Sequence, residues 1–210
     1  QMNIRLVGPN VTDFEPFYNA AILNRLRKEG RLPAAHTNNL FVERATEPEA
    51  YDHKILGRGM AGRIRFDFTR KARMLADIST WAGIKETWST HVSWSLRRIA
   101  RFLPDVERKQ ADYVARYCLL GAASGRLNRL YWGPLVGQRE GLVDDNTSEF
   151  PEIPHVTCYE RLYGAPAEYR LRPAFNTFRT VNRLLAESPY CRTLAASPEL
   201  NMIEFWSKDK

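Results

Sequence analysis

The chain has few cysteines and no long hydrophobic run. Its 210 residues include 3 cysteines, an odd and widely spaced set at Cys118, Cys158 and Cys191. This spacing excludes a disulfide framework and a structural zinc site. No apolar stretch approaches the roughly 20 residues that a membrane-spanning helix needs. We therefore expect a protein without a membrane span, either cytoplasmic or secreted.

The familiar motifs of cofactor enzymes are also lacking. The sequence contains no Walker phosphate loop, no GxGxxG after a strand, no HExxH and no GxSxG nucleophile elbow. The histidines, which are His36, His53, His91 and His155, do not have metal-ligand spacing. We therefore expect neither a cofactor nor a metal site.

Basic residues outnumber acidic ones by 31 to 24, which gives a net charge of +7. A basic chain is typical of nucleic-acid binding, and it also attracts acidic glycans. Many arginines lie next to an acid, however, as Arg139 does to Glu140. This pattern favours a solvated surface, so we expect no nucleic-acid partner. A binder of nucleic acid or of an anionic surface remains a third alternative, based on charge alone.

Short apolar runs alternate with segments of helical periodicity. Strands are predicted at 4–7, 39–42, 84–90 and 127–132, and helices at 17–28, 68–82, from 105 to a glycine at 121 or 125, and across 175–185. This alternation is typical of an α/β fold with parallel strands. The segment 137–172 has no clear period and is predicted to be a long loop with at most one short element.

Both ends of the sequence are strand-like. Gln1 precedes Met2, strand-like sequence follows at once, and a further strand is predicted at 202–206, four residues before the end of the sequence. Domains usually end in loops or frayed termini. We therefore expect this chain to be a fragment of a longer protein.

Polar and aromatic residues gather where the predicted strands end. In a (β/α)8 barrel, chemistry takes place at the carboxyl ends of the strands and in the loops that follow them. A pyranose has an apolar C–H face that suits an aromatic ring, and a fringe of hydroxyls that suits amides, hydroxyls and carboxylates. We therefore predict that an oligo- or polysaccharide binds there, through Asp13, His36, Asn38, Asn39, Trp94 and Trp132.

The order of these segments resembles the C-terminal half of a TIM-barrel glycoside hydrolase of the retaining clan that includes β-xylosidases and α-iduronidases. Leu6-Val-Gly-Pro9 resembles the family's fifth strand, and His36-Thr-Asn38 resembles the sixth. Thr90-His91-Val-Ser-Trp94 stands at the nucleophile motif of the seventh, and Trp132 stands at the end of the eighth. Ile203-Glu-Phe-Trp206 resembles a β-sandwich strand that follows the barrel.

The resemblance implies an α/β protein in which residues 1–200 form the C-terminal half of a (β/α)8 TIM barrel, with strands five to eight. Residues 201–210 would begin an accessory β-strand region. A set of four parallel strands has two open edges, which are prone to pairing. We therefore expect a partner, either a second polypeptide with the N-terminal half of the barrel or a second copy in a homodimer.

Two departures from the family bear on catalysis. The family's general acid lies at the end of the fourth strand, which would be outside this chain. The nucleophile position is occupied by His91, whereas a retaining mechanism needs two carboxyl groups about 5–5.5 Å apart. Glu86 is the candidate replacement, although strand alternation places it on the face opposite His91 and favours a salt-bridged role. Glu43 and Glu140 follow other strands and are further acids near the expected pocket.

Two functions follow from the resemblance. The first is a carbohydrate-active protein of the glycoside hydrolase type, which acts on or binds a glycan, with His91 and Glu86 as the candidate catalytic residues. Whether it is an enzyme stays open, because the general acid would come from outside the chain. The alternative is a catalytically inactive pseudoenzyme that binds a glycan without cutting it, which the histidine at position 91 favours.

Overall fold

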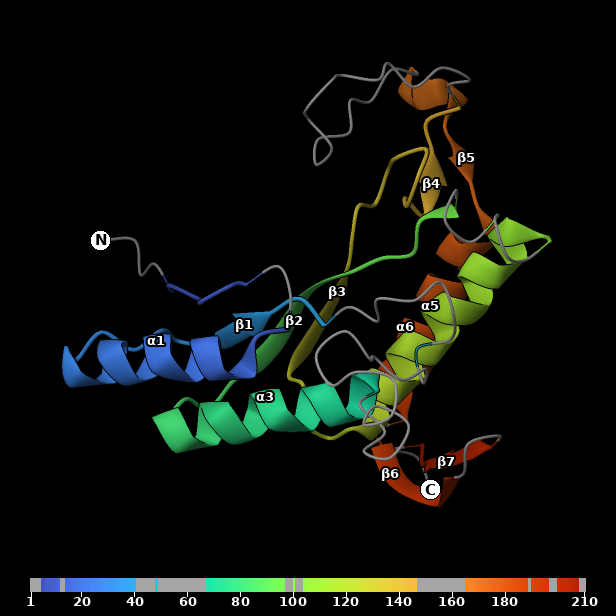
Figure 1. Cartoon of the computed structure of the whole chain (residues 1–210). Helices are drawn as coiled ribbons and strands as arrows, with labels where there is room; N and C mark the ends of the chain where they lie inside the picture. Colours follow the sequence, from blue (N-terminus) through green and yellow to red (C-terminus); the bar gives the residue numbers. More distant parts are fainter. Residues whose placement is uncertain are drawn as a thin grey trace.

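The centre of the molecule is a small parallel sheet with helices in its connections (Figure 1). The computed structural model describes residues 5–11, 14–40, 48, 67–96, 100, 104–146, 165–188, 190–196 and 200–207. Strands β1 (His36–Asn38), β2 (Thr87–Val92) and β3 (Arg129–Trp132) pair in that order, and Val7 extends the set through a parallel bridge to Ala35. The described residues thus form a mixed helix–strand structure in which neighbouring strands follow one another in the sequence.

Helices α1 (Pro16–Lys28), α3 (Phe68–Ala82) and α5 (Val106–Ala123) connect these strands. α1 begins with a proline, which lacks the N–H that a first helical residue leaves unpaired. α3 begins at Asp67, whose side chain accepts a hydrogen bond from the Arg70 amide, and ends at Gly83, whose φ of 85° favours glycine. The predicted positions of these helices are confirmed.

The main core lies between the sheet, α3 and α5. The rings of Phe68 and Tyr117 meet edge to face at 4.9 Å, and Trp94 stacks on Tyr113 at 4.1 Å. Leu75 and Val92 belong to the same buried cluster. Each of these aromatic pairs combines residues that lie far apart in the sequence, so the core fixes how the helices cover the sheet.

Helix α6 (Pro173–Glu187) runs beside α5 in Figure 1 and packs on it through Ala174 and Phe178. The predicted final helix is therefore confirmed. It is followed by the antiparallel hairpin of β6 (Tyr190–Ala196) and β7 (Asn201–Phe205). β7 was predicted from the sequence, whereas β6 was not.

The predicted strand at 39–42 is wrong. The strand is three polar residues, His36–Asn38, because the His36 amide donates to the Glu86 carbonyl and so sets the ladder to β2. Residues 41–42 lie outside the described part of the chain. Of the predicted loop at 137–172, the described residues contain the strands β4 (Val143–Asp144) and β5 (Arg170–Leu171), and the short 3-10 helix η1 (Pro166–Glu168).

Side chains alternate between the two faces of the sheet. Thr87 and Leu130 face the helices, because Thr87 Oγ1 donates to Ser79 Oγ of α3 and Leu130 packs against Gly121 of α5. Trp88 and Tyr131, one residue further along each strand, point to the opposite face and are partly exposed. None of the described helices is long and apolar enough to span a membrane.

Candidate binding site at the carboxyl edge of the sheet

Three successive strand ends meet at Thr90. Its Oγ1 atom lies 2.6 Å from Asn10 Oδ1 and 3.0 Å from Asn39 Oδ1. Asn10 follows the segment that bridges to Ala35, Asn39 follows β1, and Thr90 belongs to β2. The carboxyl ends of parallel strands lie at one edge of a sheet, so these polar side chains form a continuous row along that edge.

A second polar group lies at the same end of β2. His91 Nε2 is 3.1 Å from Ser93 Oγ, which donates to Glu140 Oε2 at 2.7 Å. The ladder between β2 and β3 is irregular between Ser89 and Val92, so strict alternation stops there and both Thr90 and His91 are half-buried. Burial lowers the pKa of His91, and the nearby charge of Glu140 opposes this effect.

Glu140 is held by the turn that follows β3. Gln110 of α5, which is fully buried, donates from Nε2 to the Glu140 carbonyl oxygen at 3.0 Å. The turn also needs a glycine at 141, because a Cβ there would collide with the backbone of Gly137. The backbone at Glu140 is thus held by a buried side chain of α5.

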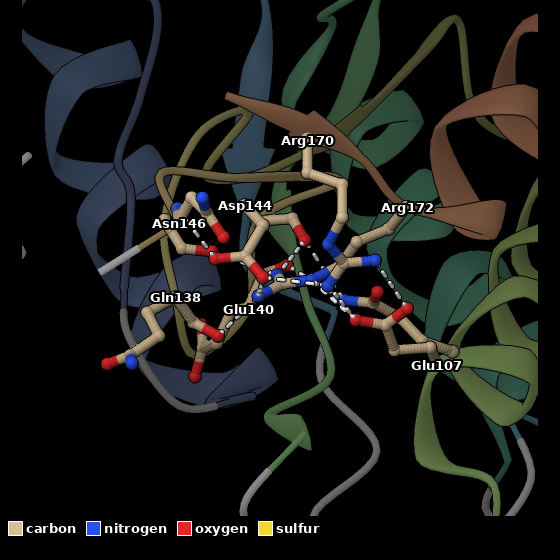
Figure 2. A network of polar contacts seen from close by, with 10 residues as sticks. Glu107, Gln138, Glu140, Asp144, Asn146, Arg170 and Arg172 are labelled. Carbon is tan, nitrogen blue, oxygen red and sulfur yellow. Dashed lines mark hydrogen bonds and ion pairs between the residues drawn. The ribbon is translucent and has the colours of Figure 1, made fainter. Parts of the chain in front are cut away.

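Arg172 clamps this turn from the other side (Figure 2). Its side chain is 2% exposed, and it donates to the carbonyl oxygens of Gly137 at 2.9 Å, Gln138 at 2.7 Å and Gly141 at 2.6 Å. A guanidinium carries five N–H donors in a fixed plane, so one side chain can bind several carbonyls at once. Arg172 therefore fixes the backbone that carries Glu140.

Two carboxylates neutralise this arginine and its neighbour Arg170. The Glu107 and Asp144 side chains lie 3.5 Å and 3.3 Å from the Arg172 guanidinium, and Figure 2 shows both arginines converging on them. Arg170 also donates to Glu107 at 2.9 Å and to Asp144 at 2.8 Å. The hydrogen bond from Arg170 lowers the pKa of Glu107. The charges of this cluster are therefore balanced within it.

Aromatic side chains flank the polar row on the face that the helices do not cover. Tyr131 is 41% exposed, and its ring lies 6.2 Å from the ring of Trp88. The guanidinium of Arg129 lies over Trp88, 4.6 Å from the ring centroid. Tyr131 stands opposite the irregular part of β2, which carries Thr90 and His91.

Several of the predicted site residues lie in the interior. His36 is fully buried, with Nδ1 2.9 Å from Ser79 Oγ, and desolvation lowers its pKa to about 4. Asn38 is fully buried, and its side-chain oxygen and nitrogen have no hydrogen-bond partner among the described residues. Trp94 is 4% exposed and stacks on Tyr113. The structure does not bring these three side chains to the edge.

The other predicted residues are divided between different places. Asn39 and His91 lie at the carboxyl edge, as described above. Trp132 is half-buried, with its ring 6.1 Å from Tyr117 and its Nε1 3.5 Å from the Glu140 carbonyl oxygen. Asp13 lies outside the described residues, as does Glu43.

Glu86 is not brought together with His91. Glu86 is the residue that precedes β2. Its carboxylate accepts hydrogen bonds from Arg5 at 2.7 Å and from Trp88 Nε1 at 2.9 Å. Both hydrogen bonds lower the pKa of Glu86, and the one from Arg5 has the larger effect. The candidate catalytic pair therefore consists of one residue at each end of the strand.

Four residues of the site were not predicted from the sequence: Asn10, Thr90, Ser93 and Tyr131. The strand alternation could have indicated Tyr131. Arg129 and Tyr131 are two residues apart and lie on one face of β3, while Leu130 and Trp132 lie on the other. The described residues contain no group of three or more histidines, cysteines or acids that could hold a metal ion. No family model, curated protein or solved structure matches the chain.

Proposed function

We propose that this protein is a carbohydrate-active protein of the glycoside hydrolase type, and that it holds a glycan at the carboxyl edge of its parallel sheet. The observation that carries the proposal is the row of Asn10, Asn39 and Thr90, together with the exposed ring of Tyr131 on the neighbouring strand β3. The ring offers an apolar surface to a sugar face, and the amides and hydroxyl offer donors and acceptors to its hydroxyls.

The arrangement of the strands supports the same proposal. Each strand is joined to its neighbour through a helix, and all of the strand ends that carry polar residues point to one edge. We propose that this sheet is part of a (β/α)8 barrel, a fold in which ligands bind at the carboxyl ends of the strands. Fold alone does not define function, so the proposal rests on the side chains at the edge.

The test is a glycan array probed with the full chain, followed by calorimetry with the best ligand. Tyr131→Ala should weaken binding at least about tenfold, because the stacking surface is removed. Tyr18→Ala is the matched control, since Tyr18 is an exposed tyrosine on α1. Absence of binding to any glycan, or equal losses in the two variants, would refute the proposal.

Binding without cleavage is the form of this function that the described residues favour. A retaining glycosidase needs two carboxyl groups about 5–5.5 Å apart. In the described part of the edge, Glu140 is the carboxylate that contacts the polar groups, while Glu86 is engaged by Arg5 and Trp88. A histidine at position 91 stabilises an oxocarbenium-like charge poorly, since a neutral ring carries no negative charge.

Hydrolysis is the second candidate, because Glu140 does place one carboxylate beside His91. In that case the general acid would come from a partner. Turnover of aryl glycosides by the full chain, alone and with its partner, separates the two candidates. Measurable turnover that is lost in Glu140→Gln would favour the hydrolase.

We further propose that the sheet pairs with more strands, from a second polypeptide or from a second copy of the chain. The described parallel sheet has an edge at β3. Exposed strand edges are common sites of association. Light scattering after chromatography should give at least twice the mass of one chain, or a complex with another polypeptide. A stable monomer would contradict this part of the proposal.

A further inference from the structure

A cavity of about 210 Å³ lies at the amino edge of the parallel sheet. Its walls come from the last two turns of α3, from the segment that precedes β2 and from the turn that joins α5 to β3. They include Ala76, Thr80, Lys85, Gly125, Arg126 and Asn128. The volume is below the roughly 300–1,000 Å³ of pockets for drug-sized ligands, so the cavity suits a small molecule or a single polar group. It lies at the opposite end of β2 from Thr90.

Two positive side chains line this cavity, and neither has an acidic partner. Lys85 and Arg126 are both exposed, and their side chains form no ion pair and no hydrogen bond in the described part of the chain. Glu86 follows Lys85 in the sequence, but its carboxylate is engaged by Arg5 and Trp88. Cations without an acidic partner beside a cavity attract an anion.

Capping of the helix ends does not account for these two cations. The carboxyl end of a helix carries partial negative charge, and a Lys or Arg side chain often binds its last carbonyls. At the end of α3, however, the Trp81 carbonyl accepts a hydrogen bond from Arg27 at 3.0 Å. At the end of α5, the Gly121 carbonyl accepts one from Ser124 Oγ at 2.7 Å. Carbonyls at both helix ends therefore have other donors.

The side-chain groups that remain available in the cavity are mainly donors. The hydroxyls of Thr80 and Thr87 already donate, to an α3 carbonyl at 3.0 Å and to Ser79 Oγ at 2.8 Å. Asn128 Oδ1 accepts from the Thr87 amide nitrogen at 2.8 Å, which orients the side-chain amide and leaves its NH₂ group to donate. An ammonium, a guanidinium and an amide NH₂ thus line one cavity, and all three bind oxygen acceptors.

We propose that this cavity binds a phosphate group through Lys85, Arg126 and Asn128. A phosphate monoester carries close to two negative charges at neutral pH, which the two cations balance, and three acceptor oxygens, which the three donor groups can bind. A guanidinium can bind two phosphate oxygens at once, while an ammonium acts as a point charge. A carboxylate has one charge and two oxygens, so it matches this set less well. The inference does not depend on the glycan site at the other edge of the sheet.

The test is a titration of the full chain with inorganic phosphate at about pH 7.5 and constant ionic strength, followed by ¹H–¹⁵N NMR spectra. We expect saturable shifts of the Asn128 side-chain NH₂ and of the Gly125 and Arg126 amides. Acetate should bind at least about tenfold more weakly than phosphate. The absence of saturable shifts at these groups, or equal binding of acetate, would overturn the proposal.

A phosphate ester separates the two sources of the ligand group. Glycerol 3-phosphate should shift the same signals as inorganic phosphate. Tighter binding of the ester would assign the site to a phosphorylated small molecule, and tighter binding of inorganic phosphate would assign it to the free ion. An ester that shifts other signals instead would overturn the assignment of the phosphate to this cavity.

Asn128→Asp is the most selective variant. A carboxylate at this position still accepts the hydrogen bond from the Thr87 amide, so the structural contact is retained. The NH₂ donor, however, is replaced by a negative charge that faces the phosphate. Saturable binding should therefore be lost, and unchanged affinity in this variant would contradict the proposed site.

Lys85→Gln and Arg126→Gln test the two charges, and each should weaken phosphate binding at least about tenfold. Both residues are exposed, so these variants keep the test decisive if Asn128→Asp is unstable. Arg70→Gln, at the other end of α3, and Arg183→Gln on α6 are the matched controls, because each removes one positive charge from an exposed residue outside the cavity. They should change the affinity less than about twofold. Equal losses in controls and cavity variants would show attraction by net charge alone and would overturn the proposal.

Discussion

His36 and His91 stand on neighbouring parallel strands, yet their surroundings differ completely. His36 is sealed between β1 and α3, where its Nδ1 contacts Ser79, whereas His91 is half-buried at the end of β2 beside Ser93 and Glu140. Residue type and nearness to a strand end do not separate the two. The direction of the side chain separates them. His36 pairs with Thr87 in the sheet, and both of these side chains point toward α3 and contact Ser79.

The same contrast holds for the polar networks as a whole. Interior groups such as His36 and Arg172 are buried and make their hydrogen bonds to other parts of the protein, so their contribution is to stability. Edge groups such as Thr90 and His91 keep part of their surface exposed, which leaves them able to meet a ligand. If this comparison is right, substitutions in the interior should reduce the free energy of unfolding, and those at the edge should mainly change binding.

The largest effect is expected for Arg172→Ala. Removal of this buried side chain leaves three backbone carbonyls without their donor and leaves Glu107 and Asp144 short of one cation. The free energy of unfolding should fall by about 3–5 kcal/mol, as measured by urea denaturation.

The control for this change is Arg179→Ala. Arg179 is exposed on α6 and, among the described residues, donates a hydrogen bond to the Asn176 side chain, so the change should stay within about 0.5 kcal/mol. If Arg172→Ala lowered the free energy of unfolding as little as Arg179→Ala does, the turn after β3 would not depend on the contacts of Arg172.

The next effect is the pH dependence that His36 produces. Its pKa is about 4 in the folded protein and 6.5 when exposed, so between these values the unfolded chain binds a proton that the folded chain does not. The contribution of His36 to the free energy of unfolding is therefore fully present above pH 6.5. It declines as the pH falls toward 4, by about 3 kcal/mol in total. Urea titrations at pH 7 and pH 4.5 measure this decline.

His36→Gln should remove most of this particular decline, whereas His91→Gln should remove less, since His91 is only partly desolvated. The difference between wild type and variant across the pH range is the quantity to compare, because carboxylates also titrate in the same interval. If both variants reduced the pH dependence of the free energy of unfolding equally, the two histidines would not differ in the way that their burial predicts.

The sequence predicted the helices well and the site only in part. Helices α1, α3, α5 and α6 were found because their periodicity, caps and glycine stops agree with the packing that they reach. The second strand was placed at 39–42 because that run is apolar, whereas the strand of the structure is the polar segment His36–Asn38. Its position is set by the ladder to β2, which a local pattern does not contain.

The aromatic residues show the same limit. Trp94 and Trp132 were chosen for their position near strand ends, but the structure packs Trp94 in the core and half-buries Trp132 against α5. Tyr131, one residue from Trp132, is the exposed ring. Arg172 carried no signal in the sequence, because its partners are backbone carbonyls about 30 residues away.

The smallest effect is expected for Arg170→Ala, and it sharpens the contrast most directly. Arg170 and Arg172 bind the same two carboxylates, but the side chain of Arg170 is 48% exposed and that of Arg172 is 2% exposed. Water and salt screen the outer arginine, and Arg172 still neutralises Glu107 and Asp144 when it is gone. The free energy of unfolding should fall by less than about 1 kcal/mol, and this loss should shrink further in 0.5 M salt. A loss close to that of Arg172→Ala would show that the carboxylate pairs, and not the buried carbonyl contacts, hold the turn that carries Glu140.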